Sequence, residues 1–176
     1  MDGYKTDPSY YCDLAGMCIF RNSYCIGNRQ ERGTGNMSMK RILVIASHEK
    51  MADGMKDTLN FISGGIQETI ALSAYVDNRS AEETIEEVMD GFEEEDEVVV
   101  LTDLMAGSVN QKFFKYRTRP HTHIVSGMNL PLAFQIAMEP QGEYITEERM
   151  KEMIEAAREE MKYINEIADD EDEEDE

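Results

Sequence analysis

The chain has 176 residues, enough for one domain with a buried core and too few for two ordinary domains. Its hydrophobic content of 41% is usual for a globular protein, but a net charge of -20 at pH 7 predicts a strongly acidic surface and argues against nucleic acid as a partner. All three cysteines lie within the first 25 residues. The apolar runs are shorter than the roughly 20 residues that span a bilayer, and the start of the chain lacks the pattern of a secretory signal. We therefore expect a cytoplasmic protein whose core is not held by disulfides.

Both ends of the chain have the composition of appendages. Residues 1–38 show neither a helical nor a strand period and end in a Gly- and Asn-rich stretch typical of a linker. We expect this segment to be vector-derived or translated from a misplaced start codon. Cys12, Cys18 and Cys25 could form a small zinc site, although no pair has the CxxC spacing. Residues 168–176 are almost entirely acidic and predict a disordered tail.

Between these ends, short apolar runs alternate with amphipathic segments. The run 41–46 is continuously apolar after its first residue, as in strands that are buried on both faces of a parallel sheet. Gly64 and Gly65 predict the end of the first helix, and Ser80 with Glu83 forms a capping box before the second. The expected strands are 41–46, 69–75, 97–102 and 121–126, and the expected helices are 51–63, 80 to about 92, 107–118, 130–138 and 146 to about 167.

This alternation predicts an α/β fold. Strand–helix units of this length form an open, doubly wound, mainly parallel sheet with helices on both faces. For four strands the expected order is 2-1-3-4, in which the strand order reverses between the first and third strands. The functional crevice of such a sheet lies there, beyond the carboxyl ends of the strands.

Two residues at that edge have the chemistry of a nucleophilic histidine. His48 follows the first strand and Asp103 follows the third, so we expect them to be neighbours. A carboxylate that binds one ring nitrogen fixes the tautomer and leaves the other nitrogen free to attack. A histidine at a strand end is by itself more often a solvated residue, and an Asp before a Gly-Ser turn is often only an N-cap. Because both residues are expected at one edge of the sheet, a catalytic role for His48 and Asp103 is the alternative interpretation.

The turn Ala106-Gly107-Ser108 opens the third predicted helix beside the same crevice. Unpaired backbone N–H groups at a helix start attract anions, so a phosphoryl group on His48 could rest there. The hydroxyls of Ser47 and Ser108 could add hydrogen bonds to its oxygens. The residues predict no metal ligand set at this edge and no cofactor.

Two other groups of residues have alternative readings. His121 and His123 are two residues apart and would share one face of a strand, which could bind a metal, although no further His or Cys accompanies them. A basic cluster in this acidic chain either complements the dipole of the third helix or docks a partner. It consists of Lys112, Lys115, Arg117 and Arg119.

Three motifs resemble one known family, the enzyme IIA domains of the mannose, fructose and sorbose type of the bacterial sugar phosphotransferase system. The motifs are ILVIASH ending at His48, LTDLMAGSVN around Asp103, and VSGMNLPL at 125–132, and their order and separations agree with that family. The resemblance covers about residues 39–165. We expect the enzyme IIA domain itself to span 39–167.

The resemblance implies that His48 takes phosphate from the phosphocarrier protein HPr and passes it to a histidine of enzyme IIB. It also implies a homodimer, with Asp103 oriented toward His48 and with membrane subunits as indirect partners. The chain departs from the family at Ala106, where a glycine is common, and after the last helix, where related domains continue into an exchanged strand. The alternatives are a phosphoryl donor for dihydroxyacetone kinase, a non-catalytic regulatory module of the same fold, and a small-anion binding protein.

Overall fold

The structure, a computed structural model, describes residues 11–12, 18–19 and 39–166, and the chain divides into two units, 1–37 and 38–176. In the first unit, β1 (Tyr11–Cys12) and β2 (Cys18–Ile19) form an antiparallel pair. The predicted linker, the zinc alternative that needs Cys25, and the predicted acidic tail fall outside the described residues.

The second unit contains a parallel sheet of four strands. They lie in the order β4-β3-β5-β6, and every neighbouring pair is parallel. In chain order this is 2-1-3-4, so the predicted α/β fold and its reversal between the first and third strands are confirmed. The strands are β3 (Arg41–His48), β4 (Glu68–Ala74), β5 (Glu97–Thr102) and β6 (Thr122–Ser126).

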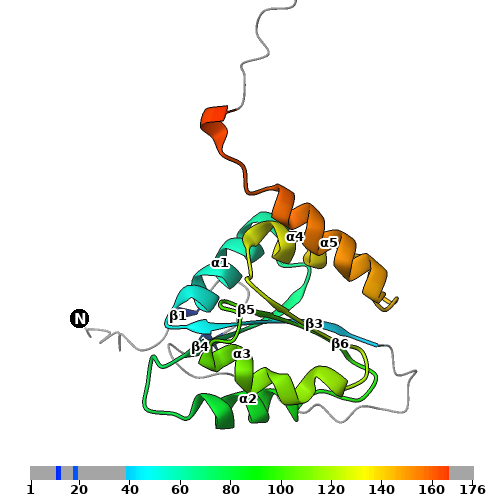
Figure 1. Cartoon of the computed structure of the whole chain (residues 1–176). Helices are drawn as coiled ribbons and strands as arrows, with labels where there is room; N and C mark the ends of the chain where they lie inside the picture. Colours follow the sequence, from blue (N-terminus) through cyan, green and yellow to red (C-terminus); the bar gives the residue numbers. More distant parts are fainter. Residues whose placement is uncertain (1–10, 13–17, 20–38, 167–176) are drawn as a thin grey trace, which may run out of the picture. The chain divides into compact units, whose positions relative to one another are not determined.

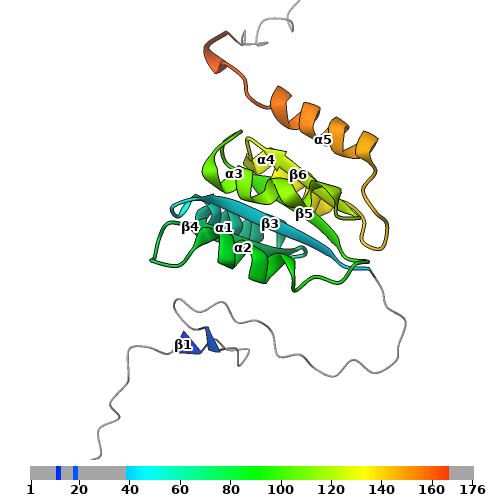
Figure 2. The ribbon, with the colours of Figure 1, turned by 60° about the horizontal axis from the view of Figure 1, so that its bottom comes forward.

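Helices cover both faces of this sheet, as Figure 1 shows. They are α1 (Met51–Ser63), α2 (Ala81–Met89), α3 (Ser108–Phe113), α4 (Leu130–Met138) and α5 (Glu147–Glu159). Along β3, Leu43 and Ile45 face the cluster with α1, α4 and α5, whereas Ile42 and Val44 face the cluster with α2 and α3. Both faces of the strand are therefore buried, which explains its continuous apolar run. In both ribbon views α5 lies next to α4 (Figure 1 and Figure 2).

The helix boundaries follow capping residues. Gly64 closes α1 in the left-handed conformation, with φ 72°. The side chain of Ser80 accepts a hydrogen bond from the Glu83 amide at the start of α2, and Asn129 and Thr146 cap α4 and α5 in the same way. These side chains pair backbone N–H groups that the helix itself leaves without partners.

Several predicted boundaries are wrong. The helix predicted over 107–118 is α-helical only to Phe113 and continues as the 3₁₀ helix η1 (Phe114–Thr118), where aromatic and β-branched residues disfavour the α form. Tyr75 and His121, expected in strands, have φ of 69° and 51° and lie just outside β4 and β6, because a left-handed residue cannot continue a strand.

The last helix is also shorter than predicted. It ends at Glu159, and a single 3₁₀ turn, η2 (Ile164–Glu166), follows. The apolar stripe of the sequence continues through Met161 and Ile164, but these side chains are 86% and 68% exposed, so no packing holds a further helical turn there. Among the described residues no helix combines the length and the apolar character that a membrane crossing requires.

A buried ion pair closes the amino-terminal edge of the sheet. Arg41 begins β3 and Glu97 begins β5, the two are paired in register, and the Arg41 Nε donates to Glu97 Oε2. The guanidinium also donates to the carbonyl oxygens of Glu139, Pro140 and Glu143, while Glu97 Oε1 accepts from the Ile145 amide. The pair thereby fastens the connection between α4 and α5 to the sheet.

Candidate active site

His48 and Asp103 meet at the opposite, carboxyl-terminal edge of the sheet. His48 is the last residue of β3, and Asp103 directly follows β5, the neighbouring strand. The His48 ring nitrogen Nδ1 lies 2.7 Å from Asp103 Oδ2, and the His48 backbone amide donates to the same oxygen at 2.8 Å. The structure thus brings together the two residues that the sequence placed at this edge.

The Asp103 carboxylate determines which nitrogen of His48 carries the proton. Burial raises the pKa of Asp103, but hydrogen bonds from the His48 amide, the His48 ring and the Leu104 amide outweigh burial, so its pKa lies below the ordinary value of 3.8. At neutral pH the carboxylate is ionised and can only accept. Nδ1 is therefore the donor, and in the neutral ring Nε2 has a free lone pair.

On the other side of the ring, Nε2 faces a hydroxyl. Ser108 Oγ lies 3.0 Å from His48 Nε2, as expected from the sequence for a residue at the start of α3. The Tyr75 hydroxyl donates to Ser108 Oγ at 2.8 Å, and the Tyr75 ring stacks on the His48 ring with centroids 5.5 Å apart. Tyr75 is not among the site residues predicted from the sequence. Those residues lie in the loops after β3 and β5, whereas Tyr75 follows β4 at the same edge.

The turn before Ser108 is shaped by close contact. A Cβ on Gly107 would lie 3.1 Å from the Leu104 carbonyl oxygen and 3.4 Å from Cε1 of the His48 ring, so a side chain there would crowd Leu104 and touch the imidazole. Ala106 adopts φ 59°, a conformation that favours glycine. The predicted phosphate-binding turn therefore lies directly beside the histidine, although α3 is only six residues long.

Ser47 does not line the crevice. Its residue is fully buried, and its hydroxyl accepts from the Ala52 amide at 2.7 Å and donates to the Glu49 carbonyl oxygen at 3.4 Å. The side chain therefore joins the end of β3 to the first turn of α1. The structure gives it the position of a residue that holds the His48 loop rather than one that contacts a bound group.

Backbone strain is concentrated around His48. Of the four non-glycine residues with positive φ in the described part of the chain, three lie in the loops at this edge, at Glu49, Tyr75 and Ala106. Such conformations cost of order 1–3 kcal/mol each and are commonest at functional sites. The loops after β3, β4 and β5 each contribute one, so all three are held in shapes that local preference disfavours.

The two other histidines are engaged elsewhere. His121 lies outside β6 and stacks on Tyr144 with ring centroids 3.7 Å apart, and His123 Nε2 lies 3.0 Å from the Ile145 carbonyl oxygen. The described residues contain no group of three or more His, Cys, Asp or Glu side chains placed to hold a metal ion. Both histidines instead contact the segment that connects α4 and α5.

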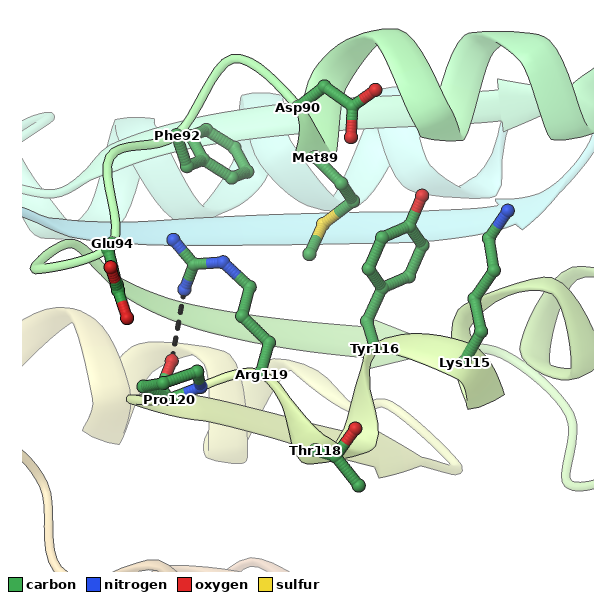
Figure 3. Close-up of a pocket in the computed structure, with 9 residues that line it drawn as sticks. All are labelled: Met89, Asp90, Phe92, Glu94, Lys115, Tyr116, Thr118, Arg119 and Pro120. Atoms are coloured by element: carbon green, nitrogen blue, oxygen red, sulfur yellow. Dashed lines mark hydrogen bonds between the residues drawn. The ribbon is translucent and has the colours of Figure 1, made fainter.

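The basic cluster makes mostly internal contacts. Lys112 and Lys115 pair with Glu82 and Glu86 of α2, Arg117 lies over the Phe114 ring, and Arg119 donates to the carbonyl oxygens of Glu93, Asp96 and Pro120. A hollow of about 560 Å³ lies here between η1 and the end of α2 (Figure 3). Its lining includes Pro120 and Glu94, which precede β6 and β5, so it lies away from His48 and the carboxyl-terminal edge.

The chain is similar in sequence and fold to known proteins. A family model described as the phosphotransferase system fructose IIA component, EIIA-man, matches residues 42–158. A crystal structure from Klebsiella pneumoniae, assigned as a phosphoenolpyruvate-dependent sugar phosphotransferase system permease, is 34% identical, covers 76% of this chain and 98% of its own, and has a TM-score of 0.67. No curated protein matches the chain.

Two more distant structures share the fold. The mannose/sorbose-specific IIA subunit from Enterococcus faecalis is 21% identical with a TM-score of 0.61, and covers 74% of this chain and 98% of its own. The IIA protein associated with the fucose utilization operon of Streptococcus pneumoniae is 23% identical with a TM-score of 0.62, and covers 73% and 96%. The matches span the parallel-sheet unit.

Proposed function

Because this chain belongs to the EIIA-man family of phosphotransferase-system IIA components, we propose that it is a phosphohistidine carrier for sugar uptake. In this proposal His48 accepts a phosphoryl group from phospho-HPr and passes it to a histidine of enzyme IIB. The observation that carries the proposal is the contact of His48 Nδ1 with the ionised Asp103 carboxylate, which leaves Nε2 as the nucleophile.

The transfer is an in-line displacement at phosphorus. The Nε2 lone pair of His48 forms the new N–P bond while the N–P bond of the donor phosphohistidine breaks, and the donor nitrogen keeps the bonding pair. The imidazole gains positive character as the bond forms, and the Asp103 carboxylate at 2.7 Å stabilises it. Passing the group to enzyme IIB reverses this step with His48 as the leaving group.

The transferred group needs partners for its oxygens. We assign the Ser108 hydroxyl and the backbone of Ala106, Gly107 and Ser108 to this role, since Ser108 Oγ lies 3.0 Å from Nε2 and Gly107 approaches the ring edge. Ser47 holds the loop after β3 in place, because its hydroxyl accepts a hydrogen bond from the Ala52 amide.

The surrounding assignments follow from the same family. The IIA domain spans 39–167 in this proposal, which includes the matched region 42–158, and residues 1–38 and 168–176 are appendages. The protein acts in the cytoplasm as a homodimer. HPr and enzyme IIB are its direct partners, and the membrane subunits that bind the sugar are indirect ones.

A labelling experiment tests the central step. The protein is incubated with enzyme I, HPr and labelled phosphoenolpyruvate, and we expect acid-labile, base-stable label on the wild type and none on His48→Ala. His121→Ala is the matched control, because His121 stacks on Tyr144 outside the crevice and its loss should leave labelling intact. Equal labelling of wild type and His48→Ala would contradict the proposal. Onward transfer to enzyme IIB, and not to a dihydroxyacetone kinase subunit, distinguishes the permease role from that alternative.

A further inference from the structure

Tyr75 lies at the site beside His48 and Asp103 but has no role so far in the proposed transfer. Tyr75 directly follows β4, whose last residue, Ala74, is in register with His48. Its φ of 69° is unfavourable for a residue with a side chain. In this conformation its ring stacks on the His48 ring, with an interplanar angle of 20°, and its hydroxyl reaches Ser108.

The hydrogen bonds around His48 fix the direction of every proton in this group. Asp103 is ionised and accepts from Nδ1, so Nε2 of the neutral ring must accept. The single hydroxyl proton of Ser108 then points to Nε2 at 3.0 Å, and Ser108 Oγ accepts from the Tyr75 hydroxyl at 2.8 Å. The order of donation is Tyr75 to Ser108 to His48 to Asp103.

We infer that Tyr75 is a positioning residue for phosphoryl transfer, acting through Ser108, in the carrier function proposed above. Phosphorus attaches to the Nε2 lone pair that the Ser108 hydroxyl now meets, so this hydroxyl has to turn aside and can then donate to a phosphoryl oxygen. The Tyr75 hydroxyl holds Ser108 Oγ from the other side and keeps it within reach of that oxygen. The protons of Tyr75 and Ser108 stay on their own oxygens throughout.

The stacked ring has a second effect on the same step. An imidazole that is 37% exposed could rotate about its own axis, but the Tyr75 face and the Asp103 carboxylate hold its plane from two directions. A fixed plane aims the Nε2 lone pair at the position that the incoming phosphorus takes. Tyr75→Phe therefore separates the two effects, because it keeps the ring and removes the hydroxyl.

The experiment measures the rate of labelling of His48 by phospho-HPr in rapid-quench assays. Tyr75→Phe should slow transfer about 5-fold, the typical value of one lost hydrogen bond, with little change in the HPr concentration that gives half the maximal rate. Tyr75→Leu should be slower still. Tyr144→Phe is the matched control, since the Tyr144 hydroxyl also makes one hydrogen bond, to the Glu95 carbonyl oxygen, but away from His48. Its rate should equal that of the wild type.

A double-mutant cycle separates action through Ser108 from any general effect. If Tyr75 acts through Ser108, the pair Tyr75→Phe and Ser108→Ala should transfer at the rate of Ser108→Ala alone. A wild-type rate for Tyr75→Phe, a full 5-fold effect in the Ser108→Ala background, or a change confined to HPr binding would each overturn the role of Tyr75 and leave the carrier function standing. A wild type that takes no label would overturn both.

Discussion

The neighbouring strands β3 and β5 position an ion pair at their amino-terminal ends and a histidine–carboxylate pair at their carboxyl-terminal ends, and the two pairs differ in burial. At the amino-terminal edge, the side chains of Arg41 and Glu97 are 1% and 0% exposed. At the carboxyl-terminal edge, Asp103 is 9% exposed and His48 is 37% exposed. The same strand register therefore positions both pairs, but only one of them can meet another molecule.

This difference separates the part of the fold that provides stability from the part that is available for chemistry. Arg41 and Glu97 use their remaining hydrogen-bonding capacity on backbone groups between Glu139 and Ile145, so breaking the pair leaves a charge in a dry interior. At the other edge, within the part of the chain that the structure describes, Nε2 of His48 has the hydroxyl of Ser108 as its hydrogen-bond partner, and this hydroxyl can turn aside. We expect substitutions at the two edges to alter different measured quantities.

The largest effect expected at the carboxyl-terminal edge is that of Asp103→Asn on transfer. An amide no longer enforces a proton on Nδ1 of His48, so a large share of the rings carries the proton on Nε2 and cannot attack. By analogy with tautomer loss in other histidine enzymes, the rate of labelling from phospho-HPr should fall about 10²- to 10⁴-fold. Loss of HPr affinity at an unchanged maximal rate would instead make Asp103 a docking residue.

At the amino-terminal edge, Glu97→Gln should lower the free energy of unfolding by about 3–5 kcal/mol, because it leaves the buried Arg41 guanidinium without a counter-charge. Urea denaturation measures this change. The matched control is Glu155→Gln, which removes the exposed partner of Arg158 and should not change stability measurably. The fraction of Glu97→Gln that remains folded should label at the wild-type rate, and a lower rate in that fraction would show that the two edges are coupled.

The sequence predicted the elements whose causes are local. The run from Ile42 to Ala46 identifies a doubly buried strand, and Gly64 ends a helix by its left-handed conformation. The predicted length of the last helix was too great, because the apolar stripe in the sequence continues to Ile164 whereas the packing ends earlier. Glu159 and Glu160 also oppose the helix dipole at the carboxyl end. A stripe shows where a helix could bury residues but not whether a surface is there to bury them.

At the site, the predicted strand order was enough to make His48 and Asp103 neighbours, but it did not indicate the hydrogen bonds of Ser47 and Tyr75. His48 and Asp103 come together because the strand order alone makes their strands adjacent. Ser47 was expected to face the crevice, but its hydrogen bond to the amide of Ala52 depends on how the chain turns into α1. Tyr75 reaches Ser108 only through a positive φ, which no residue preference indicates for tyrosine. Its position after a strand at the same edge was the available signal.

Ser47→Ala tests the contrast between the two edges of the sheet, because Ser47 lies next to His48 but is as buried as Arg41 and Glu97. Removing its hydroxyl leaves the buried Ala52 amide without its side-chain partner, which should cost about 1–2 kcal/mol of unfolding free energy. Thermal or urea unfolding measures the cost. Labelling of His48 should slow by less than about 5-fold, since the Ser47 hydroxyl bonds to the backbone of Ala52 and Glu49 and not to a ring nitrogen. A loss as large as that of Asp103→Asn would mean that Ser47 does contact the phosphoryl group.

The pH dependence of the unfolding free energy should reveal the contribution of Asp103, the carboxylate of the exposed pair. Because its pKa is lowered on folding, the carboxylate contributes stability that is fully present above the ordinary value of 3.8 and is lost as the pH falls through the lower value of the folded state. The difference in unfolding free energy between the wild type and Asp103→Asn should therefore shrink as the pH falls below about 4. A difference that does not change between about pH 5 and pH 3 would contradict the lowered pKa of Asp103.

The smallest effect is expected at Ala106, where the turn beside His48 has φ 59° and the chain carries alanine. Ala106→Gly removes the clash of Cβ with the backbone, and this gain exceeds the entropy that glycine adds to the unfolded chain, so stability should rise by about 0.5–1 kcal/mol. Ala156→Gly is the control, since Ala156 is exposed within α5 and the same change should cost about 1 kcal/mol there. Opposite signs for one chemical change would locate strain in the loop of the carboxyl-terminal edge. If both variants lose stability, the loop is not strained at Ala106.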